Sequence, residues 1–205
     1  MDLWRLCFDD TEEFIRFYFS KKYKDENTLV YRDRQGDAVA ALQMPLYPMT
    51  FAGTLLQTGY ISGACTHPLA RARGIMTKLL QEAFAVMRMR DVPVSTLIPA
   101  NDWLYGYYEK MGYATIFDFS PEHYTILDRP VLGHYRVEAF RDEALLTDEV
   151  FRYFEDVMLR RPCCIQHDRE DFNTIMEDLR ISEGALLVAY NREDHLVGMA
   201  FAEPR

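Results

Sequence analysis

Apolar residues recur with helical spacing in the segment that follows Gly74. The apolar positions on its two adjacent stripes are Ile75, Leu79 and Ala83, and Met76, Leu80 and Met87. This spacing predicts an amphipathic helix that runs from Gly74 to about Arg90. The residues before it, 55–66, have strand-forming side chains at one end and small ones at the other, and Pro68 ends them. The pattern therefore predicts a strand, a basic turn and a helix, in that order.

The remaining pattern of the first 130 residues predicts an α+β fold. Residues 92–98 are apolar and β-branched, which indicates a buried parallel strand. Before the basic turn we expect a strand at 1–8, a helix from Asp10 towards Tyr23, and a hairpin of 28–31 and 38–44 followed by a strand at 55–66. The helix would begin with a capping box of Asp10 and Glu13, and the hairpin would end at Pro45 and Pro48. After residue 98 we expect a helix at 103–111 and a final hairpin of 114–119 and 123–127.

After about residue 130 the pattern of elements starts again. Residues 136–142 are similar to residues 4–10, and two helices and a hairpin follow. The helices are expected around Val150–Met158 and at 170–179, and the hairpin strands at 186–190 and 196–201. We therefore expect two domains, at residues 1–130 and 131–205.

Composition limits the classes of function. The chain has 205 residues, of which 49% are hydrophobic, and a formal net charge of −9. Such a charge argues against a protein that binds nucleic acid through phosphates, and it is compatible with a cationic amine substrate. We expect no membrane span and no signal peptide. The four cysteines show no disulfide-like or metal-like spacing, so we expect a reduced, cytoplasmic protein without a metal.

The basic turn predicts an anion site. A helix start presents N–H groups without partners, Arg71 and Arg73 add charge, and Gly74 lets the backbone approach a ligand. The sequence contains neither the G-x-x-x-x-G-K-[ST] of a nucleotide-hydrolysing P-loop nor the G-x-G-x-x-G of a dinucleotide site. A phosphate or pyrophosphate of another ligand class is therefore expected.

Two motifs resemble those of the GNAT superfamily of acyl-CoA N-acyltransferases. Residues 71–76, RARGIM, resemble the [RQ]-x-x-G-x-[GA] turn that holds the CoA pyrophosphate, and Met76 departs from it as in the Eis-like branch. Asn101 followed by residues 108–113, YEKMGY, resembles the second signature, N-x₆–₇-Y-x-K-x-G-F. The resemblance covers residues 1 to about 128. It implies an α/β/α arrangement, with a mixed, mostly antiparallel sheet flanked by helices.

The resemblance also implies the site residues. Tyr108 would protonate the CoA thiolate, although by itself it could be a packed aromatic residue. The residues implied for the cofactor site are Gly63, Ala64, Cys65 and Thr66 at the thioester and pantetheine, Arg71, Ala72, Arg73, Gly74, Ile75, Met76 and Thr77 at the pyrophosphate, and Asn101 and Tyr105 nearby.

Two features of the chemistry stay open at this point. A nucleophilic Cys65 would need a base and a lowered pKa, and no partner is readable from the sequence. No general base is assigned. The candidates by residue type are His67, Glu82, Asp102 and Asp118.

The function implied by the resemblance is N-acetyl transfer from acetyl-CoA to a primary amine of a small molecule or peptide, by direct attack in a ternary complex. The alternatives are a non-catalytic module of this fold that binds acyl-CoA or a partner protein, and an interaction domain without a CoA site. Residues 160–172 resemble the start of the second of two tandem GNAT domains in Eis-like acetyltransferases. We therefore expect a partial second domain without the sterol-carrier-like third domain of that branch. A homo-oligomer is possible, and the acceptor would depend on loops near 23–27 and 46–51.

Overall fold

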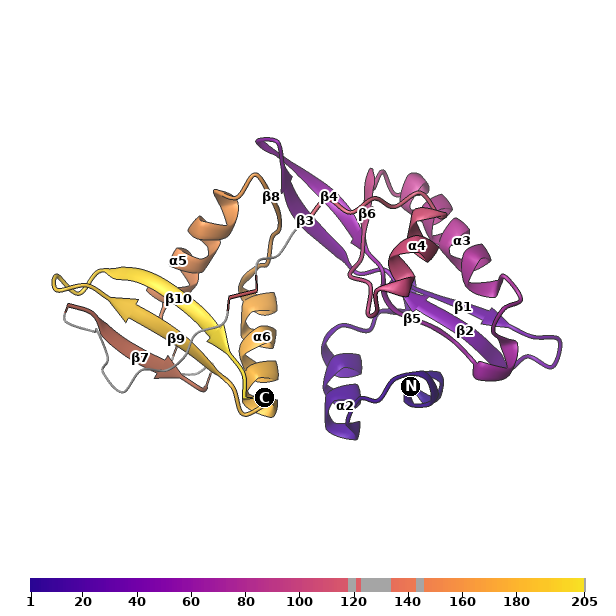
Figure 1. Cartoon of the computed structure of the whole chain (residues 1–205), viewed down its shortest axis with the longest axis horizontal. Helices are drawn as coiled ribbons and strands as arrows, with labels where there is room; N and C mark the ends of the chain where they lie inside the picture. Colours follow the sequence, from indigo (N-terminus) through magenta and orange to yellow (C-terminus); the bar gives the residue numbers. More distant parts are fainter. Residues whose placement is uncertain (118–120, 123–133, 143–145, 205) are drawn as a thin grey trace. The chain divides into compact units, whose positions relative to one another are not determined.

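The computed structural model describes residues 1–117, 121–122, 134–142 and 146–204. The chain divides into two compact units, residues 1–114 with 161–166, and residues 115–160 with 167–205. Each unit is described by itself. As expected, the fold is mixed α+β, with helices and several sheets (Figure 1). None of the described helices is long and apolar enough to cross a membrane.

The first unit holds two sheets. One sheet has the order β1-β2-β5 and the other the order β6-β4-β3-β8. The pairing of β4 with β6 is parallel, and the other strand pairings of the described residues are antiparallel. The strands are β1 (Thr28–Arg32), β2 (Ala38–Gln43), β3 (Leu46–Phe51), β4 (Thr54–Tyr60), β5 (Ser62–Thr66), β6 (Val94–Thr96) and β8 (Cys163–Ile165).

The helices of this unit are α1 (Asp2–Cys7), α2 (Glu12–Lys21), α3 (Ile75–Met89) and α4 (Trp103–Glu109), with short 3₁₀ turns at Asp25–Asn27 and Pro68–Ala70. Figure 1 shows α3 along the sheet of β1, β2 and β5. Leu79, Leu80, Ala83 and Met87 of α3 are buried against Ala40 and Leu42 of β2 and against Met44, which directly follows that strand. The helical stripe predicted from the sequence is therefore the one that forms the core.

The opposite face of the same sheet carries α1. We predicted a strand at residues 1–8, and this prediction is wrong. In the helix, Trp4 and Cys7 are three residues apart and both reach β5, since Trp4 packs on Gly63 and the Cys7 thiol contacts the Thr66 carbonyl oxygen at 3.4 Å. Arg5 lies on the outside and pairs with Asp2 and Glu12. A run of apolar residues this short fits both the 3.6-residue period of a helix and the two-residue period of a strand.

The next helix, α2, begins one residue later than expected. The side chain of Thr11, rather than Asp10, accepts the capping hydrogen bond, from the Phe14 N–H at 3.2 Å. The Asp10 carboxylate instead accepts a hydrogen bond from the Trp4 indole at 2.7 Å. The carboxylate that the sequence suggested as a cap therefore fixes α1 to the start of α2.

Strand β3 was not predicted, because Pro45 and Pro48 suggested a loop. The strand pairs with β4 over its whole length, through a turn in which Ala52 and Gly53 both have positive φ. Pro48 lacks an N–H, but its carbonyl oxygen accepts a hydrogen bond from the Gln166 N–H at 2.8 Å. β8 then pairs with residues 49–51 of β3, beyond the proline. A central strand therefore tolerates the proline at the point where its second partner ends.

The second unit is a three-stranded antiparallel sheet with two helices. The sheet has the order β10-β9-β7, and its elements are β7 (Arg136–Phe140), α5 (Asp148–Leu159), α6 (Arg169–Ile181), β9 (Ala185–Tyr190) and β10 (Leu196–Ala202). The two helices and the hairpin confirm the sequence prediction. The expected similarity of residues 136–142 to residues 4–10 is not structural, because the first segment contains a strand and the second a helix.

The hairpin expected at 114–119 and 123–127 lies mostly outside the described residues. Residues 114–117 are described and form no strand.

Candidate functional site

Two parallel strands part at the position where the sequence suggested the thioester site. β4 and β6 pair over three residue pairs, the last of which is Tyr60 with Thr96. Beyond it, the Ile61 N–H donates to the Thr96 carbonyl oxygen at 2.8 Å. After Ile61 the chain continues as β5, whose only strand neighbour among the described residues is β2. One edge of β5 therefore has unpaired main-chain groups next to the diverging β6. Such an edge can pair with an extended ligand as if with another strand.

The four predicted residues of β5 differ in their surroundings. Ala64 packs against the core, and Cys65 is buried. The Thr66 carbonyl oxygen already accepts hydrogen bonds from the Arg71 side chain at 3.1 Å and from the Cys7 thiol. Gly63 has a φ of +57°, and a Cβ there would lie 2.3 Å from a ring carbon of Trp4. The small size of Gly63 is therefore required by Trp4, whatever ligand lies at the edge.

The thiol of Cys65 is poorly suited to be a nucleophile. Burial raises the pKa of the Cys65 thiol to about 12, and the adjacent Cys7 adds to the increase. A nucleophilic cysteine needs the opposite shift, which a nearby cation or a helix N-terminus produces. The geometry therefore argues against the covalent alternative.

The basic turn leads into the N-terminus of α3. Ala72 and Gly74 both have positive φ, at 60° and 70°, so the chain reverses sharply between the two arginines. Arg71 and Arg73 are exposed, and neither forms an ion pair with a carboxylate of the described residues. Arg71 is oriented by its hydrogen bond to Thr66, whereas Arg73 has its guanidinium free for a ligand.

The first turn of α3 presents main-chain donors. The first hydrogen bond of the helix runs from the Lys78 N–H to the Gly74 carbonyl oxygen at 3.2 Å, and Gly74 offers no side-chain cap. No described group accepts a hydrogen bond from the N–H groups of Ile75, Met76 and Thr77. The side chains of Ile75 and Met76 pack against the core, so the large residue at position 76 leaves the N–H groups accessible. Three N–H groups, a helix dipole and two guanidinium groups are the features that binding of an anion requires.

Three tyrosines of α4 and the turn after it form a cluster. The ring of Tyr108 lies between those of Tyr107 and Tyr113, with centroid distances of 5.3 and 5.7 Å and edge-on geometry. The Tyr107 hydroxyl lies 3.4 Å from the Thr77 hydroxyl in the first turn of α3, and the Tyr113 hydroxyl lies 2.6 Å from that of Ser95 on β6. The two outer tyrosines thus connect α4 to the anion site and to the parting strands.

The hydroxyl of the middle tyrosine, Tyr108, has no hydrogen-bond partner among the described residues. Burial, and to a lesser extent Tyr107, raises the pKa of the Tyr108 phenol. The phenol therefore stays protonated at neutral pH and is able to donate a proton. Sequence reasoning proposed Tyr108 but not the contacts around it. Tyr113 stands in the motif and Tyr107 directly precedes its tyrosine, while Thr77 and Ser95 become the partners of these two residues only in the fold.

The remaining predicted residues are placed less specifically. Asn101 and Tyr105 are exposed at the start of α4, where the Asn101 carbonyl oxygen accepts from the Leu104 N–H. Among the candidate bases, His67 uses its Nδ1 to cap the 3₁₀ turn, accepting from the Leu69 N–H at 3.2 Å. Glu82 and Asp102 are exposed. Asp118 lies outside the described residues, and no base is assigned.

Comparisons with known proteins agree with this geometry. Residues 1–116 match a protein family described as "Acetyltransferase (GNAT) domain". A comparison with curated proteins finds no match. The structure of a probable N-acyltransferase from Enterococcus faecalis is similar over 100% of this chain and 52% of its own, with a TM-score of 0.71 and 14% identity. A GCN5-related N-acetyltransferase from Anabaena variabilis is similar over 98% of this chain and 50% of its own, with a TM-score of 0.64 and 16% identity.

The chain therefore spans about half the length of these two proteins, and at such identities they show the fold alone. The family match covers more than half of the chain and contains the parting strands, the basic turn and the tyrosine cluster. This chain belongs to the GNAT acetyltransferase family.

Proposed function

We propose that this chain transfers an acyl group from acyl-CoA, with acetyl-CoA as the donor, to a primary amine. The observation that carries the proposal is the free edge of β5 where β4 and β6 part, close in sequence to the unpaired N–H groups of α3. Pantetheine would pair with the edge, and the pyrophosphate would bind at residues 71–77. The thioester carbonyl would then lie near β5, where a main-chain N–H can stabilise the oxyanion.

The reaction would proceed by direct attack in a ternary complex. The amine nitrogen attacks the thioester carbonyl carbon, a C–N bond forms, and the C–S bond breaks. Tyr108 donates its proton to the departing thiolate, and the proton that the amine loses passes to solvent or to a base that is not assigned. Two properties of Tyr108 support this role: its phenol is protonated at neutral pH, as the acid must be before each turnover, and its hydroxyl has no hydrogen-bond partner among the described residues.

We further propose that the chain is related to the Eis-like branch and that its second unit is a partial GNAT-like domain. The second unit has the order β7, α5, α6, β9, β10, and its last four elements repeat the order α1, α2, β1, β2 of the first unit. Both whole-chain structural matches are to proteins about twice as long. A tandem arrangement would give this order of elements.

Binding of CoA tests the proposal most directly. Isothermal titration with CoA and acetyl-CoA compares the parent with Arg73→Glu and with Arg88→Glu, which makes the same charge change in the last turn of α3. We expect Arg73→Glu to raise Kd at least tenfold, or about 1.4 kcal/mol, and more at low salt. We expect Arg88→Glu to change Kd less than twofold. Equal effects of the two variants, or no binding by the parent at millimolar ligand, would refute the pyrophosphate site.

A turnover assay separates the enzyme from a non-catalytic module of the same fold. The second candidate is favoured by one observation, namely that His67 is occupied as a cap and the described carboxylates nearby are exposed. Release of free CoA thiol is followed with a panel of primary amines for the parent and for Tyr108→Phe. An enzyme shows amine-dependent release that Tyr108→Phe reduces at least tenfold with an unchanged Kd for CoA. Binding without release would establish the module.

A further inference from the structure

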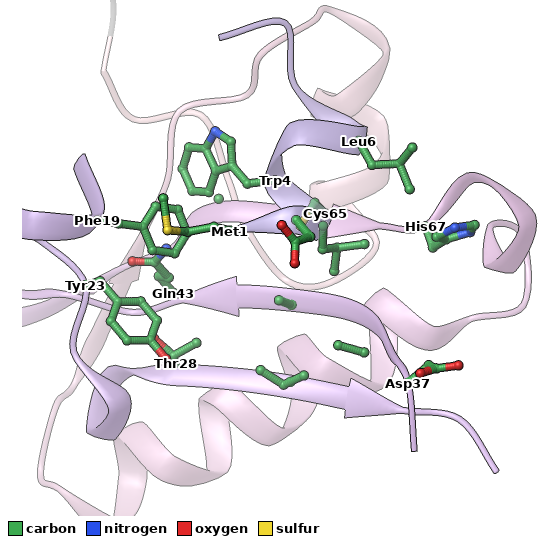
Figure 2. A pocket seen from close by; sticks show the side chains of 16 residues that line it. Met1, Trp4, Leu6, Phe19, Tyr23, Thr28, Asp37, Gln43, Cys65 and His67 are labelled. Carbon is green, nitrogen blue, oxygen red and sulfur yellow. The ribbon is translucent and has the colours of Figure 1, made fainter. Parts of the chain in front are cut away.

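A cavity of about 460 Å³ lies on the face of the β1–β2–β5 sheet that carries α1. Its floor is made of side chains from the three strands, and its walls are α1 and the end of α2 (Figure 2). The volume is in the range of pockets that hold small organic molecules. None of the proposed roles above uses this cavity.

One wall of the cavity is aromatic. The rings of Trp4 and Phe19 meet edge-on with centroids 5.5 Å apart, and Phe19 stacks on Tyr23 at 5.4 Å. All three rings line the cavity. An aromatic wall of this kind favours an apolar body and attracts a cation to its ring faces.

The floor of the cavity contains an unsatisfied polar group. Gln43 of β2 is 5% exposed, and its side-chain carbonyl oxygen has no hydrogen-bond partner in the part of the chain that the structure describes. Figure 2 shows Gln43 close to Phe19 and Tyr23 at one end of the cavity. A buried acceptor without a donor is unfavourable, and a ligand N–H would relieve it.

The charges of the cavity are few. Among the described residues that line it, Asp37 presents a carboxylate, whereas the Asp2 carboxylate is exposed and paired with Arg5, and the N-terminal amino group of Met1 is a cation. These lining residues include no lysine or arginine, and the chain as a whole carries a net charge of −9. The preference for an amine therefore rests on the aromatic wall and on Gln43, and the net charge of the chain adds a general attraction for a cation.

The cavity is adjacent to the strand that is proposed to hold the thioester. Gly63 and Cys65 of β5 line the cavity, and β5 is the strand whose second edge has no strand neighbour among the described residues. We infer that the cavity binds the acceptor, a primary amine attached to an apolar, ring-sized body, with an N–H donated to Gln43. This inference rests on the proposed function, because it names the substrate class of that reaction. The ring lies along Trp4 and Phe19, and the amine points towards β5.

Two probes with the same ring and opposite charge test the ligand class. Binding of 2-phenylethylamine and of phenylacetate to the whole chain is measured by saturation-transfer NMR and calorimetry, with and without CoA. We expect the amine to bind and phenylacetate not to bind. Equal binding of both probes, or no binding of the amine, would overturn the inference.

Three variants locate the bound amine. Gln43→Met removes the acceptor with little change in volume, and Gln81→Leu is the matched control on the exposed side of α3. We expect Gln43→Met to raise the Kd of the amine at least fivefold and Gln81→Leu to leave it unchanged. Ala41→Leu, which fills the cavity from its floor, should abolish binding and covers the case in which Gln43→Met does not fold. An unchanged Kd in a folded Gln43→Met or Ala41→Leu protein would place the amine elsewhere.

The failure of this inference can be told apart from the failure of the proposed function. If the amine binds as described but no acetyl transfer occurs, the cavity is established and the reaction is refuted. If acetyl transfer to amines occurs and the variants leave the KM of the amine unchanged, the reaction stands and the cavity is not the acceptor site.

Discussion

Replacement of Gly63 by alanine tests how β5 is held in place. Gly63 has a φ of +57°, where a residue with a Cβ is less stable by about 1–2 kcal/mol. The added Cβ would lie 2.3 Å from one Trp4 ring carbon and 3.1 Å from two others. The indole has little room to move, because its N–H is bonded to Asp10 at 2.7 Å and its ring packs on Tyr18 at 4.8 Å. Such overpacking typically costs about 1–3 kcal/mol, which gives a total of about 2–5 kcal/mol.

Gly74→Ala is the matched control. Gly74 has a φ of +70°, and a Cβ there would meet nothing within 4 Å. Its substitution should therefore cost only the backbone contribution of about 1–2 kcal/mol. The difference between the two variants isolates the contact with Trp4, and it should be about 1–3 kcal/mol.

The assay is unfolding in urea, followed by tryptophan fluorescence and circular dichroism. Both tryptophans, Trp4 and Trp103, lie in the first unit, so fluorescence follows that unit. Trp4→Leu should relieve the overlap, so that Gly63→Ala costs less in that background than in the parent. Equal costs for the two alanine variants, or no reduction with Trp4→Leu, would refute the packing argument.

Three further predictions concern single groups. Tyr113→Phe removes the hydrogen bond to Ser95 and should lower the free energy of unfolding in urea by about 1–2 kcal/mol. If this bond holds Tyr113 in place against Tyr108, kcat falls while the Kd for CoA is unchanged. An unchanged kcat would argue against such a positioning role. Cys65→Ala should retain turnover and iodoacetamide should label Cys65 slowly at pH 8, since burial raises the pKa of this thiol to about 12; rapid labelling would contradict this. The bonds from Arg5 lower the pKa of Glu12 to about 2, so the stability that Glu12 contributes is present above its ordinary pKa near 4.3 and is lost as the pH falls towards 2. Glu12→Gln should therefore differ from the parent above pH 4.3 and converge with it near pH 2, and a constant difference would be inconsistent with the pair.

Much of the fold could be predicted, because the apolar residues of several elements recur with the clear period of a helix or of a strand. The stripe of α3, the hairpin of β1 and β2 and the parallel pairing of β6 could all be predicted, because each follows from a local pattern of apolar residues or from turn residues. Strand β3 was not predicted, because Pro48 within it suggested a loop, and the segment that pairs with the strand beyond this proline, residues 163–166, is more than a hundred residues away. Helix α1 was predicted as a strand because its six residues fit the period of a strand as well as that of a helix. The packing of Trp4 on Gly63 favours the helix, and this contact is visible only in the fold.

The turn at residues 71–74 and the helix start with its unpaired N–H groups could be predicted, because main-chain donors at a helix start depend on local sequence, and anion binding there stays a prediction. The contacts of Tyr107 and Tyr113, whose rings flank Tyr108, could not be predicted, since their hydroxyl groups meet Thr77 and Ser95 only in the tertiary fold. The sequence also gave no indication that Gln43 lines a cavity. It is a polar residue in a strand, and its unpaired carbonyl oxygen becomes apparent only when the cavity around it is known.

The pairing of β8 with β3 has a consequence for the order in which the chain is synthesised. β3 ends at Phe51, but its second partner is residues 163–165, and the Thr50 hydroxyl donates to the Arg161 and Cys164 carbonyl oxygens at 2.9 and 3.3 Å. During translation, the edge of β3 stays open until more than a hundred further residues have left the ribosome. An open edge in a nascent chain invites pairing with other chains. A gene fragment cut at the end of the family match, residue 116, would keep the basic turn and the tyrosines but would leave this edge permanently uncovered.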